Sequence, residues 1–533
     1  MGRKPIQRGE QLVWLTGAAL TVTLLATVTL IGVVMVNGLG YFWPSTLAVA
    51  RLVDGGTAMG EITQRDYTDE GDLWRIQFKV GNRDLYGADF RWIDAAAIET
   101  LNYPEDAAAL EREEYGNFYG FLERLDLATV QVDAGLPPWE RLQAARDAVE
   151  ERFEAIESLN ESVSADSHEM ERIRLAILEL RYEGGAGAED GIARLEEQLA
   201  PVRADFDARN AEAAARLAEL RSNTATFADA AGRTKEMPIL SLVRTYRPNA
   251  MSVPAKALFY LGKVWELLSA NPRESNTEGG LFPAIFGTVM LVMLMSLFCI
   301  PLGVVAAVYL QEYAREGLLV RMVRIAVFNL AGVPSIVYGI FGLGFFVYGV
   351  GGTIDELFFP ERLPNPTFGT GGILWASLTL ALLTVPVVIV VTEEALAAIP
   401  GGIREASLSL GATRFQTLWR LLLPIAAPGI ITGFVLSTAR AAGEVAPLMI
   451  TGVVKLAPAL PLDGEFPFFH LDRKFMHLGF HIYDVGFQSP NVEAAKPMVF
   501  ITTLLLLAIV IGLSIVAIVL RNSMQKRYAG KAF

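Results

Sequence analysis

Cysteine is almost absent from this chain of 533 residues, because Cys299 is the only one. An intrachain disulfide is therefore excluded, and cysteine usage says little about the compartment. The chain also lacks the pattern GxxxxGK[ST], in which a glycine-rich loop and a lysine hold nucleotide phosphates. If transport or catalysis here needs ATP, another chain has to bind it.

A surplus of basic residues is missing as well. The sequence holds 45 Lys and Arg against 58 Asp and Glu, and its net charge is -13. Excess carboxylates repel a phosphodiester backbone, so a nucleic-acid partner is not expected. Yet 52% of the residues are hydrophobic, which conflicts with one acidic soluble domain. The conflict disappears if a membrane part is joined to a polar part, and residues 51–281 alone hold 43 Asp or Glu against 26 Lys or Arg.

Six apolar runs are each long enough to cross a hydrocarbon core about 30 Å thick. The first, 12–36, follows a short basic tail, 1–11. It is longer than the apolar core of a signal peptide and lacks an obvious small-residue cleavage site, so we predict a retained span. Five more spans are predicted in a core covering 282–520, at 282–311, 325–350, 372–397, 426–453 and 497–520.

The acidic region 37–281 has the patterns of an α+β domain. Two alternating apolar runs around Gly-Asn-Arg-Asp predict a β-hairpin over 73–92. Apolar residues at helical spacing predict an antiparallel helical hairpin over about 139–221, whose charges form a solvated face or bind another subunit. Residues 239–246 are predicted to form a strand that returns to the first β segment. Residues 255–268 have the spacing of an amphipathic helix, for which the membrane surface is one plausible place.

Basic residues predict the topology. Lys and Arg are concentrated in the N-terminal tail, in the loops near 315–324 and 404–420, and in the C-terminal tail 521–533. The loops near 351–371 and 454–496 hold fewer. Because short cytoplasmic loops carry the positive excess, we expect both termini in the cytoplasm and residues 37–281 outside.

The loop 401–424, GGIREASLSLGATRFQTLWRLLLP, lies between two of these apolar runs. Glycine at 411 suits the end of a short helix, because it tolerates the left-handed conformation. Thr413 and Gln416 have the spacing of a capping box for a second helix, which Pro424 is expected to end. From the pattern alone, an amphipathic helix lying on the lipid surface is an equally good interpretation.

The order of residues in this loop resembles the EAA signature of ABC importer permeases. The matching positions are Glu405, Ala406, Ser407, Gly411, Leu423 and Pro424. Ser407 replaces the second alanine of the signature. The resemblance implies that the loop is the coupling helix that fits a groove on a cytoplasmic ATPase.

Two charges lie inside the predicted fifth span, in the stretch STARAAGEVAPLMITG. An arginine at a helix centre costs about 2.5–3.5 kcal/mol on insertion scales, so Arg440 should face a partner or a wet cavity. Glu444 follows at i, i+4, a spacing that allows pairing. The pair serves either as a structural ion pair or in a substrate path, where arginine can hold an oxyanion through two hydrogen bonds.

The third span contains AGVPSIVYGIFGL at 331–343, in which Ser335 and Tyr338 are candidates for lining a path. Glycine and proline in membrane helices more often serve packing or bending, and that alternative stays open. His470, His477 and His481 lie in the last outer loop without accompanying ligands, so no metal site is expected.

Together with ARAAGEVAPL at 439–448 and the loop itself, the third span resembles the PstA-type permease subunits of phosphate-specific ABC importers, over about residues 280–520. The region 37–281 is longer than in compact members. The resemblance implies an inner-membrane permease that is not itself an enzyme and has no cofactor of its own. It also implies a PstC-like sister, a PstB-like ATPase dimer that binds ATP and Mg²⁺, a PstS-like binding protein, and inorganic phosphate as substrate.

Two alternatives to phosphate import remain from the residues. One is a permease for another oxyanion, such as sulfate or molybdate, since no selectivity filter can be identified in the sequence. The other is a membrane-anchored sensor or scaffold that uses the acidic helical hairpin to hold a partner.

Overall fold

Among the residues that the structure describes, six helices are long and apolar enough to cross a membrane, which confirms the number predicted from the sequence. The computed structural model describes residues 10–68, 72–185, 187–464, 466–489 and 492–529. The chain forms two units. A membrane unit contains the residues up to Phe42, Leu281–Gly351 and Phe368 onward, and an α+β unit contains Trp43–Gly280 and Gly352–Thr367. The ends of the two basic tails, residues 1–9 and 530–533, lie outside the described residues.

The candidate spans are Val13–Gly40, Phe282–Tyr313, Ser335–Phe358, Ile373–Ala397, Arg414–Gly443 and Val492–Lys526. Short helices and π-helical turns connect or extend them. In chain order the helical elements here are α1 (Glu10–Gly40), α6 (Phe282–Val308), η4 (Tyr309–Tyr313), α7 (Leu318–Leu330), α8 (Ser335–Phe341), η5 (Gly342–Gly351), α10 (Ile373–Ala397), α11 (Gly401–Ser409), α12 (Arg414–Thr417), η7 (Leu418–Leu422), α13 (Leu423–Gly443), α14 (Ala446–Thr451), α15 (Leu478–Tyr483), η8 (Asp484–Gln488) and α16 (Val492–Ala529).

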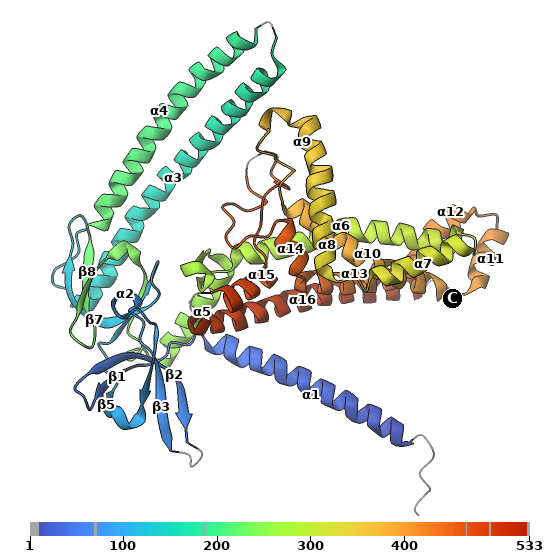
Figure 1. Cartoon of the computed structure of the whole chain (residues 1–533). Helices are drawn as coiled ribbons and strands as arrows, with labels where there is room; N and C mark the ends of the chain where they lie inside the picture. Colours follow the sequence, from blue (N-terminus) through green and yellow to red (C-terminus); the bar gives the residue numbers. More distant parts are fainter. Residues whose placement is uncertain (1–9, 69–71, 186, 465, 490–491, 530–533) are drawn as a thin grey trace, which may run out of the picture. The chain divides into compact units, whose positions relative to one another are not determined.

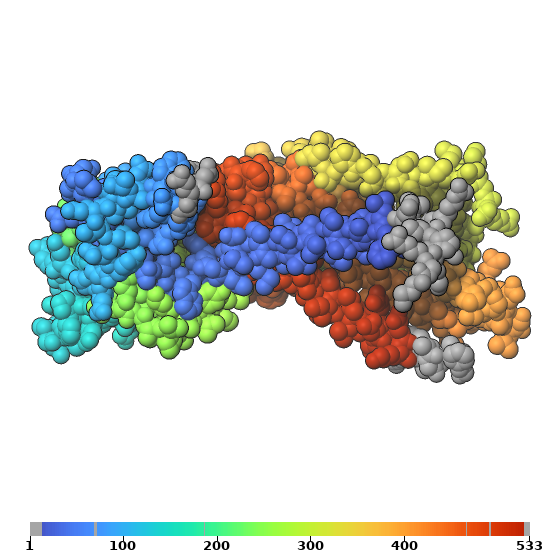
Figure 2. Space-filling model, turned by 90° about the horizontal axis from the view of Figure 1, so that it is seen from below, coloured from blue at the N-terminus to red at the C-terminus, as the bar shows by residue number. Residues whose placement is uncertain are grey.

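Helices α6, α10, α13 and α16 pack together in the membrane unit. Their shared core includes Leu291, Met295, Leu380 and Ala441, all without exposed surface. At Gly303 a Cβ atom would lie 2.6 Å from a methyl carbon of Val388, so glycine permits close packing of α6 on α10. Helix α1 contacts α16 near Gly38, but most of its apolar side chains are exposed (Figure 2). That exposure is typical of a helix surrounded by lipid.

The third span starts later than the predicted residue 325. Helix α7 ends at Leu330, and α8 begins at Ser335 after Pro334. Proline has no N–H and disfavours helical geometry in the preceding residue, so one continuous helix from 325 to 350 does not form. Arg321 and Arg324 therefore lie on a separate helix, α7, rather than in an irregular loop.

The prediction that Pro424 ends a helix is wrong. Helix α12 continues through the π turn η7 into α13, and together they form the span Arg414–Gly443. Pro424 occupies one of the first two positions of α13. The wider π turn just before it changes the hydrogen-bond pattern where the missing N–H would otherwise interrupt the helix.

The α+β unit contains two five-stranded antiparallel sheets, in the orders β4-β3-β2-β1-β5 and β10-β6-β7-β8-β9. Two further strands pair separately. The strands are β1 (Leu47–Leu52), β2 (Thr57–Tyr67), β3 (Leu73–Lys79), β4 (Phe90–Asp94), β5 (Ile98–Asn102), β6 (Ala108–Arg112), β7 (Phe118–Asp126), β8 (Thr224–Ala228), β9 (Thr234–Pro238), β10 (Leu242–Tyr246), β11 (Pro272–Arg273) and β12 (Glu278–Gly279). The helical elements are α2 (Arg83–Tyr86), η1 (Ala95–Ala97), α3 (Pro138–Glu183), α4 (Ala188–Arg221), η2 (Ile239–Ser241), α5 (Val253–Ser269), η3 (Glu274–Asn276), α9 (Gly352–Phe358) and η6 (Pro360–Arg362).

The predicted β-hairpin over 73–92 is confirmed, since β3 pairs with β4 antiparallel and Phe78 faces Arg91. The predicted partner of residues 239–246 is wrong. Strand β10 pairs with β6 in the second sheet rather than with the first β segment, and Thr245 lies opposite Leu110. A pattern of alternation identifies a strand but not its neighbour, because every sheet edge offers the same backbone groups.

Helices α3 and α4 form the predicted antiparallel hairpin (Figure 1). At about 1.5 Å per residue, the 46 residues of α3 extend roughly 69 Å. Near the sheets, Leu142, Ala145 and Val149 of α3 join the core formed with Phe118 and Phe227. Farther along the hairpin, Arg209 donates to both carboxylate oxygens of Asp166, at 2.8 and 2.7 Å. A small apolar core thus stabilises the hairpin where it meets the sheets, and ion pairs between α3 and α4 stabilise it farther out.

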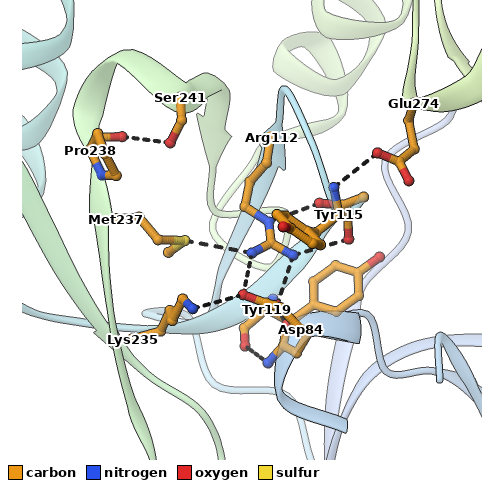
Figure 3. A network of polar contacts seen from close by, with 11 residues as sticks. Asp84, Arg112, Tyr115, Tyr119, Lys235, Met237, Pro238, Ser241 and Glu274 are labelled. Atoms are coloured by element: carbon orange, nitrogen blue, oxygen red, sulfur yellow. Dashed lines mark hydrogen bonds and ion pairs between the residues drawn. The ribbon is translucent and has the colours of Figure 1, made fainter. Parts of the chain in front are cut away.

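Arg112, at the end of β6, is a buried arginine that joins several loops of the α+β unit (Figure 3). Only 4% of it is exposed. Its two terminal nitrogens donate to the two carboxylate oxygens of Asp84, at 3.0 and 3.1 Å, and its remaining contacts include the carbonyl oxygens of Tyr115 and Gly116. Burial raises the pKa of Asp84, but the hydrogen bonds and the charge of Arg112, together with a hydrogen bond from Lys235, outweigh burial and lower the pKa overall.

We predict that Arg112→Leu lowers the free energy of unfolding of this unit by about 3–5 kcal/mol, because it leaves the Asp84 carboxylate buried without its main partner. The matched control is Arg124→Leu, which removes an exposed pair with Asp126 worth about 0–1 kcal/mol. Hydrogen exchange of the β6 amides in the full chain measures both. Equal protection in the two variants would contradict a structural role for Arg112.

A second ion cluster attaches α5 to the sheets. The Lys263 ammonium lies 2.8 Å from Glu111 and 3.0 Å from Glu266. Arg244 of β10 contacts the same two carboxylates, at 3.2 and 3.0 Å, and Arg273 lies 2.7 Å from Glu266. Burial raises the pKa of Glu266, but the three cations more than offset this effect and lower it to about 2.

This lowered pKa predicts acid sensitivity. The pKa of Glu266 is lower in the folded chain than the ordinary 4.5, so its contribution is complete above pH 4.5 and is lost as the pH falls toward 2. The shift corresponds to about 3 kcal/mol as an upper estimate. Glu266→Gln should remove this dependence on pH, measured by hydrogen exchange of β10 between pH 2 and pH 7. The control Glu99→Gln, at an exposed ion pair, should leave it unchanged.

Candidate functional site

The loop 401–424 is held to the membrane helices by an arginine. Arg404 of α11 donates to the carbonyl oxygens of Leu396 and Ile399, at 2.6 and 2.7 Å. Leu396 lies at the C-terminal end of α10, where helix carbonyls lack partners within the helix, and Ile399 follows just after that end. Arg404 also contacts the Glu312 carboxylate of η4 at 2.9 Å. One guanidinium therefore connects α11 with the ends of two spans.

The internal structure of the loop follows its sequence closely. Gly411 has φ +86°, the left-handed conformation expected after a short helix, and α11 ends at Ser409. The capping box of Thr413 and Gln416 is present in both directions, at 3.1 and 2.9 Å. The hydroxyl oxygens of Ser407 and Thr417 lie 2.8 Å apart and connect α11 with α12.

The outward surface of this loop is mostly uncovered. Glu405 and Ala406 are exposed, and Leu410 is 90% exposed. Phe415 and Trp419 stack at 6.3 Å, and 64% of each is exposed. A groove of about 520 Å³ is lined by Ile403, Ala406, Ser407, Leu410, Ala412, Gln416, Arg420 and Leu421. The surface has the apolar side chains and the concavity that a protein partner requires.

The spacing of Phe415, Leu418, Trp419 and Leu422 is that of one apolar helix face, but the structure divides these residues. Leu418 and Leu422 are buried against Leu396, whereas Phe415 and Trp419 are exposed. Leu423 and Pro424 lie at the start of α13 rather than at the end of a surface helix.

The two charges of the fifth span lie where its helix is interrupted. Helix α13 ends at Gly443, and α14 begins at Ala446. Arg440 lies in the last turn of α13, so it does not occupy the middle of a continuous span over 426–453, as the sequence suggested. Its Nε lies 3.6 Å from a carboxylate oxygen of Glu444, and both side chains are partly exposed, by 34% and 20%.

Helix α8, which carries Ser335 and Tyr338, packs against the segment that follows this interruption. A Cβ atom at Gly339 would lie 2.7 Å from the Cα of Pro447, so the two backbones meet there. Tyr338 is buried, with 4% of it exposed, and its hydroxyl donates to the carbonyl oxygen of Leu330 at 2.7 Å. Ser335 forms the first turn of α8 and is half-buried.

The three histidines of the last predicted outer loop have separate partners. His470 contacts Asp463 at 2.9 Å, the His477 ring accepts from the Gly479 amide at 3.1 Å, and His481 lies 3.2 Å from the Thr502 hydroxyl. Among the described residues, no three His, Cys, Asp or Glu side chains gather as a metal site.

Comparison with known proteins identifies this architecture. Residues 299–529 match the family of binding-protein-dependent transport system inner membrane components. The probable ABC transporter permease protein YqgI of Bacillus subtilis is 33% identical over 223 residues, which cover 40% of this chain and 70% of that protein. The chain belongs to this permease family. It is therefore an ABC transporter permease subunit and a multi-pass membrane protein, and it is a transport component rather than an enzyme.

Other relatives of the permease carry a more specific description. The phosphate transport system permease protein PstA of Pasteurella multocida is 30% identical over 43% of this chain and 74% of its own length. PstA 1 of Mycobacterium tuberculosis is 36% identical over 32% and 51%. The resemblance to PstA permeases is thus confirmed, although the chain spans only about half to three quarters of these relatives. The MetNI methionine transporter is similar at 19% identity and a TM-score of 0.33, over 51% of this chain and 99% of that one.

Two residues that fix the position of the permease loop were missed by sequence reasoning. Arg404 was counted only as a positive charge for topology, and Glu312 was not considered. The position of Arg404 directly before Glu405 and close to the end of an apolar run was a usable indication. Its acidic partner lies 92 residues away in the chain, and nothing in the local pattern shows that the two meet.

We predict that Gly339→Val disturbs the permease fold, because a side chain at this position meets the backbone of Pro447. The matched control is Gly344→Val, because a Cβ atom at Gly344 would have open space around it. Thermal unfolding of the detergent-purified chain should be shifted down by several degrees for the first variant only. Equal unfolding temperatures would show that α8 and α14 do not meet as closely as the structure has them.

Proposed function

We propose that this permease forms half of the transmembrane path of an ATP-driven importer of inorganic phosphate. The observation that carries the proposal is the Arg440–Glu444 pair at the interruption between α13 and α14, beside the Tyr338 segment of α8. Family membership makes this a transport protein, and the relatives named PstA favour phosphate.

The chemistry of the pair suits a transient anion site. A guanidinium offers two parallel N–H groups to a tetrahedral oxyanion. At 3.6 Å, Glu444 partly neutralises Arg440, which keeps the site from holding an anion too tightly. Conduction requires such weak binding, since an ion that binds too strongly does not leave. Ser335 and Tyr338 are proposed to line the same path.

The loop 401–424 is proposed to dock the ATPase. Glu405, Ala406 and the groove beside Ser407 would face a cytoplasmic ATPase, with Gly411, Leu423 and Pro424 setting the shape of the loop. The contacts of Arg404 with the end of α10 and with Glu312 would pass movement of α11 to two spans. Switching between outward- and inward-facing states would then follow ATP binding and hydrolysis in the partner.

The assembly that we propose has four kinds of subunit. A PstC-like sister completes the path, a PstB-like ATPase dimer binds ATP and Mg²⁺, and a PstS-like protein delivers phosphate. Both termini would lie in the cytoplasm and residues 37–281 in the periplasm, with the chain in the inner membrane. This arrangement follows from the distribution of basic residues.

Uptake of labelled phosphate by reconstituted complexes tests the role of Arg440. Arg440→Ala should reduce uptake at least tenfold, because it removes the anion ligand, and Arg440→Lys should give an intermediate rate, because it keeps the charge but loses the paired N–H groups. Co-purification of the ATPase with each variant is the control for assembly. Undiminished uptake by an assembled Arg440→Ala complex would exclude Arg440 from the path.

The same assay separates phosphate from other oxyanions. An arginine and a carboxylate also suit sulfate or molybdate, so the chemistry of this pair alone does not select among them. Unlabelled phosphate should compete with labelled phosphate at concentrations at which sulfate and molybdate do not. If sulfate competes equally well, the proposal of a phosphate importer would be replaced by that of an importer with a broader oxyanion specificity.

A further inference from the structure

Helix α5 of the α+β unit carries four large apolar residues on its outside. Leu258, Leu261, Trp265 and Leu268 recur at helical spacing on one side, and we call this side the outward face of α5. Their exposed fractions are 73%, 63%, 70% and 39%. The four residues that define this face carry no charge.

The charged residues Lys263 and Glu266 of α5 point the other way. They enter the buried ion cluster with Glu111, Arg244 and Arg273 described above. On the same inner side, Leu267 is only 6% exposed and Phe259 packs against Tyr246, with ring centroids 4.5 Å apart.

The outward face of α5 differs from the outer side of a helix on a water-exposed surface. Such helices direct an apolar stripe to the core and charges to solvent, because apolar area in water is unfavourable. In α5 the ion cluster fixes the orientation, so the helix does not simply rotate to hide its leucines. The outward face therefore requires an apolar environment outside the α+β unit.

The position of α5 in the chain indicates which environment this is. Tyr260 packs against Trp43, at 6.3 Å between ring centroids. Trp43 follows Gly40, the last residue of the first span, by three residues, which reach about 11 Å at most. Helix α5 is therefore tethered close to the point where the chain leaves the membrane. The next span begins at Phe282, soon after α5 ends at Ser269.

We propose that α5 lies in the membrane surface with its outward face in lipid. Helices at this depth bury their apolar face about 5–10 Å into the boundary between headgroups and acyl chains. Tryptophan and tyrosine are enriched there, which fits Trp265, Tyr260 and Trp43. A face made only of apolar residues, next to a membrane span, matches lipid better than the mixed polar surface typical of a subunit contact.

Spin labels on the full chain test this proposal. Leu258→Cys and Leu261→Cys place labels on the outward face, and Tyr182→Cys places one on α3, where the side chain is 63% exposed. Cys299→Ala provides the background, because Cys299 is the only native thiol. The chain, with the subunits that co-purify with it, is reconstituted into phosphatidylethanolamine and phosphatidylglycerol vesicles. The relaxation rate of each label is then measured in the presence of oxygen, which concentrates in lipid, and in the presence of a nickel chelate, which stays in water.

The expected result is that oxygen relaxes the labels at 258 and 261 several-fold more than the nickel chelate does, with the opposite order at 182. Faster relaxation by nickel at both α5 positions would place the face in water and overturn the proposal. Weak relaxation by both reagents would mean that protein covers the face, either this chain or another subunit, and would also overturn it. Because the labels replace exposed residues, both variants should fold.

Discussion

A bilayer removes water as a partner for backbone carbonyl and amide groups, and the permease core depends on how its interrupted helices meet that constraint. Helix α7 ends at Leu330, whose carbonyl oxygen accepts from the Val333 amide and from the Tyr338 hydroxyl on the next helix. Helix α10 ends near Leu396, and Arg404 satisfies carbonyls there. Pro424 has no N–H to donate, and the π turn just before it changes the hydrogen-bond pattern so that the helix continues. Each interruption is accompanied by a local solution, so the breaks are part of a stable structure.

In the α+β unit, buried charged side chains likewise have partners of opposite charge. Arg112 is buried but holds Asp84 through two hydrogen bonds, and Glu266 is buried among three cations. In both places removal of one partner leaves a charge in a poorly solvated position, which costs more than the pair contributes. These clusters determine which loops lie together and which side of α5 faces inward. The main effect of these clusters is to fix the orientation of the loops and of α5 rather than to add net stability.

Residue patterns predicted much of this chain. The six spans, the β-hairpin of 73–92, the long helical hairpin and the Thr413–Gln416 capping box all depend on local spacing, and all are present. Two of the failures depend on partners distant in the chain, and one depends on a neighbouring π turn. Strand β10 was assigned to the wrong sheet, and the helix at Pro424 was ended too early because proline was read without the π turn before it. Arg404 was overlooked because its partner Glu312 lies in another span.

The contacts of Arg404 have a mechanical consequence. Through three short hydrogen bonds or ion contacts, one side chain holds α11 to the end of α10 and to η4. The backbone between Ala397 and Gly401 is only a few residues long and offers little slack. A displacement of α11 would therefore move the ends of both spans together instead of bending the loop between them. If an ATPase docks on this loop as proposed, the contacts of Arg404 would carry a displacement of α11 to both spans.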